Sequence, residues 1–204
     1  MNENFLFDQD VLEKLKTITS KGVLNAAHGF SGMVGRKIHV KSATAEVVPV
    51  LTIPEIAGKA DEDAVGIYLR FKGDVDGQMI MIVPYLRAME LVDLMTEVPP
   101  GTTHHLGSLE RSALGELGNL CGSFFLNSVS SLTYAQFQPT PPAVMVDMAG
   151  AILDVVVATT GGITEYALLM QANFVDGARS VEADFWVIPD MNSLTEMIKK
   201  NAEE

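Results

Sequence analysis

The two halves of the chain follow the same order of predicted elements, and this repeat restricts the possible fold more than any other feature. Each half begins with a long helical pattern, at 10–31 and 109–130, which leads into an extended segment. Two hydrophobic strands joined by a turn follow, 64–71 with 78–83 and 165–174 with 181–188. Each half then places a proline before a last helical pattern, and IVPYLRAMELVDLM aligns with VIPDMNSLTEMIKK, Pro84 over Pro189. We therefore predict a single domain, 1–204, with pseudo-equivalent halves at about 8–98 and 106–203.

This order of elements favours an α+β fold. Hydrophobic strands with helices segregated between them predict an antiparallel sheet and long helices in two layers. One element remains ambiguous, because 149–157 has helical character but contains the β-branched run Val155, Val156 and Val157. Helix and strand both stay open there.

Composition excludes several functions. The net charge of −12 argues against nucleic acid and anionic membrane surfaces, whose phosphates would be repelled. One cysteine, Cys121, rules out an internal disulfide and a cysteine-based metal cluster. The N-terminal sequence lacks the features of a signal peptide, and no apolar run is long enough to span a membrane. We expect a cytoplasmic protein that neither binds nucleic acid nor inserts into a membrane.

The second long helix carries a coherent polar stripe. At 100° per residue, six side chains fall within about 80° of one another: Ser112, Glu116, Asn119, Ser123, Asn127 and Ser130. Five apolar side chains lie away from the stripe and are predicted to face the core: Leu114, Leu117, Cys121, Phe125 and Val129.

Glu116 and Asn119 are the strongest candidates for chemistry. They stand one turn apart, so a carboxylate and an amide on one rigid face could grip a cation and orient a water. A solvated helix face explains so short a motif equally well. Gly115, Gly118 and Gly122 surround the pair, and each costs about 1 kcal/mol relative to alanine in a helix interior. They permit close approach either by a packed neighbour or by a docking partner.

Four positions give this chain a specific resemblance. Ser112, Glu116 and Asn119 are followed by Pro142, 23 positions after Asn119. This spacing resembles the Asp/Ser-x3-Glu-x2-Asn motif and later proline of the CheC family of chemotaxis phosphatases, which includes CheX and FliY. The stretches GELGN and PPAVMVDMAGAI also agree, and the resemblance extends over residues 8–202. It implies a CheC-like, internally duplicated fold with pseudo-twofold symmetry.

The resemblance also implies an activity, the dephosphorylation of a phosphorylated response regulator of the CheY type. In that reaction Asn119 would orient the attacking water, and Glu116 would pair with the active-site lysine of the regulator. We expect Ser112, Ser123 and Pro142 to contact the regulator. The chain would need no cofactor of its own, because Mg²⁺ is expected in the phosphorylated partner.

The first half departs from the family motif. Thr17 and Ser20 occupy the positions of the glutamate and the asparagine, Glu13 stands at the preceding position, and Ala43 replaces the proline. Neither hydroxyl offers a charge for a lysine or an amide for a water. We therefore predict a structural first helix and one active site.

A second interpretation is a non-catalytic module that docks the receptor deamidase CheD or a response regulator. In CheC proteins the segment corresponding to 147–154 docks CheD, so Asp147 is a candidate docking residue. A helix that only covers the sheet explains this segment as well, and both explanations stay open. We predict no metal site, because His104 and His105 lack acidic or cysteine neighbours at ligand spacing and are expected to face solvent.

Overall fold

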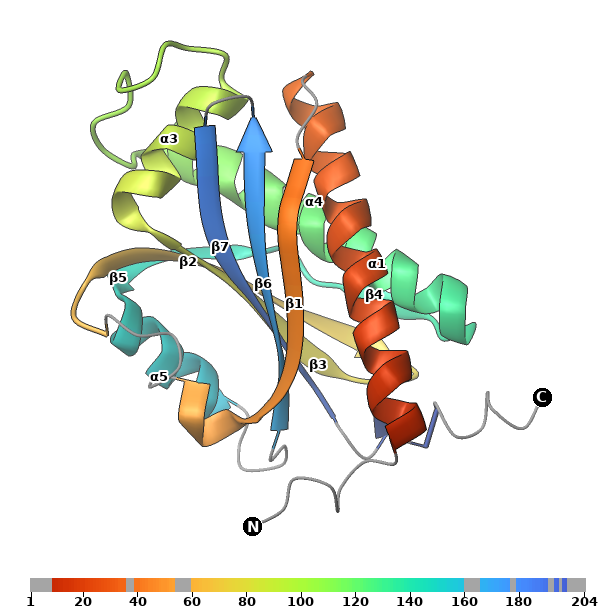
Figure 1. The fold of residues 1–204 in the computed structure, drawn as a ribbon. Helices are drawn as coiled ribbons and strands as arrows, with labels where there is room; N and C mark the ends of the chain where they lie inside the picture. The colour runs from red at the N-terminus through yellow and green to blue at the C-terminus, as the bar shows by residue number, and fades with distance from the viewer. Residues whose placement is uncertain are drawn as a thin grey trace.

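The computed structural model describes residues 9–35, 39–53, 60–159, 166–176, 179–190, 193–194 and 196–197. Its elements fall in two series along the chain (Figure 1). The first series is α1 (Gln9–Val34), β1 (His39–Pro49), the short 3-10 helix η2 (Val50–Thr52), β2 (Asp63–Gly73), β3 (Gly77–Pro84) and α3 (Tyr85–Met95). The second is α4 (Ser108–Thr133), β4 (Phe137–Pro139), β5 (Ala143–Met148), α5 (Ala149–Thr159), β6 (Tyr166–Asp176) and β7 (Arg179–Pro189).

The sheet relates the two halves of the chain by its strand order. Its seven strands run β1-β6-β7-β3-β2-β4, and β5 also pairs with β2. All pairs are antiparallel. When β5 is taken as the end strand beside β2, the order is β1-β6-β7-β3-β2-β5, and exchanging β1 with β5, β2 with β6 and β3 with β7 turns it into its own reverse. The predicted α+β class with an antiparallel sheet and long helices is therefore confirmed, and α1 and α4 both have 26 residues.

Helices cover both faces of the sheet. Adjacent residues of β2 decide this, because a Cβ on Gly66 would meet Ile152 of α5, whereas Ile67 lies against Gly118 of α4. Figure 1 shows α5 on the side of the sheet away from α4. The long helices thus form one complete layer, and α5 with η2 adds a partial layer on the opposite face.

The long helices α1 and α4 pack against each other at close range. A Cβ on Gly22 of α1 would clash with the Phe125 ring, and one on Gly29 would clash with Phe124. Between these contacts, the Asn25 amide donates a hydrogen bond of 2.7 Å to the Ser128 hydroxyl. Small residues on α1 therefore let aromatic side chains of α4 fill the interface.

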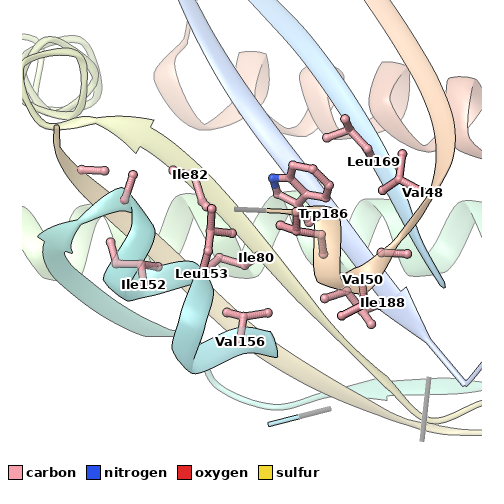
Figure 2. Packing of buried hydrophobic residues seen from close by; sticks show 14 residues of the cluster. Val48, Val50, Ile80, Ile82, Ile152, Leu153, Val156, Leu169, Trp186 and Ile188 are labelled. Atoms are coloured by element: carbon pink, nitrogen blue, oxygen red, sulfur yellow. The ribbon is translucent and has the colours of Figure 1, made fainter. Parts of the chain in front are cut away.

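The core under α5 is apolar and surrounds Trp186 (Figure 2). This side chain is 0% exposed, and within the part of the chain that the structure describes its indole N–H has no hydrogen-bond acceptor. Hydrogen bonds to the buried Gln78 side chain anchor the end of α5 to the sheet. The Gln78 amide oxygen accepts hydrogen bonds from the Tyr68 and Thr159 hydroxyls, at 2.7 and 2.9 Å. The ambiguous segment is a helix, in which Val156 is buried and Val155 is exposed.

The two prolines of the repeat lie at equivalent places, each at the end of a strand of the sheet. Pro84 and Pro189 are the last residues of β3 and β7, and Pro84 is the N-cap of α3 rather than its first helical residue. After Pro189, the Asp190 carboxylate accepts hydrogen bonds from the Ser193 backbone and hydroxyl, as an N-cap does. Much of the predicted last helix lies outside the described residues.

Asp93 fixes the loop that leads into α4. Its carboxylate, 1% exposed, accepts hydrogen bonds from the backbone N–H groups of Gly101, Thr102 and Thr103 at 2.6, 3.2 and 2.8 Å. Burial alone would raise the pKa of Asp93. Hydrogen bonds from the Thr103 side chain and the three backbone groups outweigh burial and hold the pKa below its usual value.

We expect Asp93→Asn to lower the free energy of unfolding by about 1–3 kcal/mol, because an amide N–H would then face buried N–H groups. Since folding lowers the pKa, the stabilisation from the carboxylate is present above the unfolded pKa of about 3.9 and is lost as pH falls through the folded value. Urea unfolding followed by fluorescence of the single tryptophan measures both effects, with exposed Asp154→Asn as the control. Equal stability of the Asp93 and Asp154 variants at pH 7 would contradict this role for Asp93.

Candidate active site

Helix α4 separates an apolar face from a polar one, as its sequence predicts. All five predicted core residues are buried: Leu114, Leu117, Cys121, Phe125 and Val129. None of the six residues of the predicted polar stripe is buried: each is half-buried or exposed. The sheet therefore holds one face of α4 and leaves the stripe accessible to a partner.

Glu116 and Asn119 lie in the middle of this stripe. The Glu116 side chain is exposed and that of Asn119 is half-buried. With one helical turn between them, their Cβ atoms are about 5–6 Å apart. Among the residues that the structure describes, neither side chain has a hydrogen bond or ion pair with another residue. Both are thus free to bind groups supplied from outside the chain.

Pro142 lies against the same part of α4. Its ring is 3.9 Å from the positions that a Cβ would take on Gly115 and on Gly118, the residues just before Glu116 and just before Asn119. The structure therefore places Pro142 beside the part of α4 that carries Glu116 and Asn119. Val144 also reaches this place, 3.7 Å from the Gly115 Cβ position. Sequence reasoning missed Val144, although a side chain two residues after Pro142 in an extended segment was expected on the same side of the chain.

The glycines of α4 are explained by packing within the protein. A Cβ on Gly118 would overlap Ile67, and one on Gly122 would come within 2.7 Å of Leu69, both on β2. Gly115 has only ordinary contacts with Val144 and Pro142. Of the two explanations left open by the sequence, close packing holds for Gly118 and Gly122, and these glycines are no evidence for docking.

Ser112 and Ser123 extend the stripe on either side of the pair. Ser112 is exposed and Ser123 is half-buried. Because α4 begins at Ser108 with Gly107 as its N-cap, Ser112 lies more than one turn inside the helix and does not cap it. Both serines are therefore accessible to a partner.

Comparison with known proteins agrees with this geometry. Residues 109–146, which contain the stripe and Pro142, match the model of the CheC-like family. The chain is also 27% identical over 192 residues to the CheY-P phosphatase CheC of Bacillus subtilis strain 168, covering 91% of this chain and 92% of that protein. Over this length the chain is similar to the CheC-like family.

Solved structures share the CheC-like fold. FliY of Thermotoga maritima superposes with a TM-score of 0.76 at 16% identity, covering 98% of this chain and 99% of that one. CheX of Borrelia burgdorferi, solved in a complex with CheY, BeF3 and Mg²⁺, superposes with a TM-score of 0.55 at 15% identity, covering 84% and 97%. At these identities the comparison establishes the fold only.

Helix α1 carries different side chains from α4 at the equivalent positions. Helices α1 and α4 start 99 residues apart, which puts Thr17 opposite Glu116 and Ser20 opposite Asn119 in the aligned halves. The Thr17 hydroxyl donates to the Glu13 carbonyl oxygen at 2.9 Å, so it is engaged within its own helix. Ala43, at the position of the proline, is on β1, although its side chain lies outside the described residues. That α1 has only a structural role stays a prediction.

The remaining reactive side chains do not join the stripe. Cys121 is buried, and burial raises the pKa of its thiol to about 12, which keeps it protonated at neutral pH. His104 and His105 are exposed in the loop before α4. No group of three or more metal-ligating side chains occurs in the described ranges.

None of the described helices is long and apolar enough to cross a membrane.

Asp147 lies apart from the catalytic candidates, near the end of β5. It is exposed, and its carboxylate accepts a hydrogen bond of 2.8 Å from the Met148 backbone just before α5 begins. Two apolar side chains close to it in sequence are also exposed, Met148 at the end of β5 and Val155 on α5. Asp147 is therefore accessible to a partner.

Proposed function

We propose that this chain is a phosphatase that hydrolyses the aspartyl phosphate of a CheY-type response regulator. The observation that carries the proposal is the accessible Glu116–Asn119 pair, one turn apart on a rigid helix and flanked by Pro142, with no described partner of its own. Similarity to the CheY-P phosphatase CheC over nearly the whole chain supports the same reaction.

In the proposed reaction, the Asn119 amide inserts beside the phosphoryl group and holds a water in line with the bond that breaks. The water oxygen forms a bond to phosphorus, the bond from phosphorus to the carboxylate oxygen of the regulator breaks, and the proton of the water passes to the released phosphate or to solvent. An amide suits this task because it donates and accepts hydrogen bonds without being consumed. Positioning supplies most of the catalysis, and Mg²⁺ bound in the regulator stabilises the charge.

Glu116 has a separate task in this proposal. Its carboxylate pairs with the active-site lysine of the regulator, which fixes the angle at which Asn119 enters the site. Ser112, Ser123 and Pro142 lie around the pair and complete the contact with the regulator. Rigidity matters here, because a displacement of 1 Å in a catalytic group can lower a rate by about 10²-fold. The buried face of α4 and its packing on β2 supply that rigidity.

The test is to mix the protein with Mg²⁺ and Bacillus subtilis CheY that has been phosphorylated chemically, and to follow phosphate release. We expect acceleration in proportion to the concentration of the protein. Phosphate release at the spontaneous rate over a wide range of concentrations, with binding retained, would contradict the proposal and favour a non-catalytic module.

Glu116→Gln should separate binding from chemistry. Loss of the charge removes the ion pair with the lysine but keeps the size of the side chain, so we expect KM to rise roughly tenfold and kcat to change little. Steady-state phosphate release at varied CheY concentration gives both constants. The effect on KM should shrink at high ionic strength, where the wild-type ion pair is screened. An unchanged KM at low salt would show that Glu116 does not pair with the lysine of the regulator.

A non-catalytic module remains the second candidate, and one observation favours it. Asp147 is exposed, and Met148 and Val155, close to it in sequence, expose apolar side chains. On this alternative the chain would dock the receptor deamidase CheD through Asp147 and α5, or hold a regulator without turning it over. Binding of CheD that Asp147→Lys abolishes, combined with no acceleration of phosphate release, would support this alternative.

A further inference from the structure

The polar stripe of α4 is extended by one large apolar residue. Leu109 lies seven residues before Glu116, which places it about 20° from Glu116 around the helix and about 10 Å away along the axis. It therefore lies at the edge of the 80° arc that the polar stripe occupies, at the same angle around the helix as Asn127. Its side chain is 68% exposed. A single exposed leucine is ordinary, so its alignment with the stripe is what carries the inference.

The other exposed apolar residues of α4 do not share this alignment. The large exposed side chains of the helix are Leu109, Phe124 and Leu132. Phe124 lies outside the arc and packs against Gly29 of α1. Leu132 is about 140° from Leu109 around the helix and 38% exposed. Of the three, only Leu109 points the same way as the catalytic candidates.

The position of Leu109 is held firmly by the chain before it. The Asp93 carboxylate binds three backbone N–H groups of the 101–103 loop. Next along the chain, Leu106 is buried, and its carbonyl oxygen accepts a hydrogen bond of 3.2 Å from the Arg111 guanidinium. The Arg111 backbone N–H donates to the Gly107 carbonyl oxygen at 3.0 Å and closes the first turn. The exposed leucine thus stands on a preorganised turn, which lowers the entropy lost on binding.

We propose that Leu109 is a docking and specificity residue for the phosphorylated regulator. This inference rests on the proposed function, because the regulator is the partner that the stripe would bind. The occupant must carry an apolar surface about 10 Å from the lysine that pairs with Glu116, measured along α4. A regulator that is polar or acidic at that place would be rejected, because its polar group would lose water against Leu109 without gaining a hydrogen bond.

The test measures binding apart from catalysis. The probe is dye-labelled Bacillus subtilis CheY, activated with beryllofluoride and Mg²⁺ so that no phosphate turns over, and the readout is fluorescence anisotropy. We expect Leu109→Ala to weaken binding roughly tenfold and Leu109→Met to restore most of it. Leu132→Ala, the matched control on the same helix, should bind within about twofold of wild type. In turnover, Leu109→Ala should raise KM and leave kcat nearly unchanged.

Several results would overturn the inference. Binding by Leu109→Ala within about twofold of wild type would do so and leave the proposed function standing. An equal loss in Leu132→Ala would show a general effect on the helix. Absence of binding by the wild-type chain would overturn both this inference and the proposed function. Conversion of a wild-type dimer into a monomer by Leu109→Ala, seen by size-exclusion chromatography, would assign the leucine to a contact between copies of the chain.

Discussion

Asn119→Ala is expected to lower kcat for phosphate release from phosphorylated CheY by about 10²-fold. The water would lose the group that holds it in line, and positioning supplies most of the proposed rate. KM should change by less than kcat, because the Glu116 ion pair would remain. Single-turnover loss of phosphate at saturating protein measures the change directly.

Two further variants sharpen the interpretation of Asn119. Asn119→Asp keeps the shape but places a negative charge next to the phosphoryl group, so its activity should fall at least as far as that of the alanine variant. Asn127→Ala removes an exposed amide from the same stripe two turns later and serves as the matched control. Equal losses in the Asn119 and Asn127 variants would contradict a specific role for Asn119.

Gly118→Ala is expected to destabilise the protein by about 1–3 kcal/mol, despite the better helix propensity of alanine. The added methyl group would overlap the Ile67 side chain, which is itself buried against the sheet. Gly115→Ala is the matched control three residues earlier, where the nearest atoms are 3.7 and 3.9 Å from the new Cβ. It should raise the free energy of unfolding by about 0.5–1 kcal/mol. Urea unfolding followed by Trp186 fluorescence distinguishes the two, and a stabilised Gly118→Ala variant would contradict the packing described for α4.

Much of the fold could be predicted because hydrophobic periodicity and the repeat agreed. The spacing of Leu114, Leu117 and Cys121 identified the buried face of α4 without any structure. The sequence could not decide whether 149–157 was a helix, because β-branched residues suit a strand and their packing on the sheet is a tertiary effect. The layer formed by α5 on the second sheet face followed from that packing and was likewise not predicted.

Only part of the candidate site could be predicted from the sequence. The spacing of Glu116 and Asn119 fixes their relation on a helix, since helical geometry is local. The contact of Pro142 with the turns that carry them depends on where β5 crosses α4, which no local pattern specifies. For the same reason the glycines could not be assigned to packing or docking until Ile67 and Leu69 were seen against them. Asp93 gave no signal at all, because its partners are backbone groups eight to ten residues away.

The most direct test of the central claim compares the two halves of the chain in one assay. Single-turnover dephosphorylation of Bacillus subtilis CheY should be measured for wild type, for Glu116→Ala with Asn119→Ala, and for Thr17→Ala with Ser20→Ala. We predict that the first double variant loses acceleration almost completely and that the second retains it, because only α4 presents a carboxylate and an amide. Activity near wild type in the Glu116 and Asn119 double variant would contradict the assignment of the active site to α4.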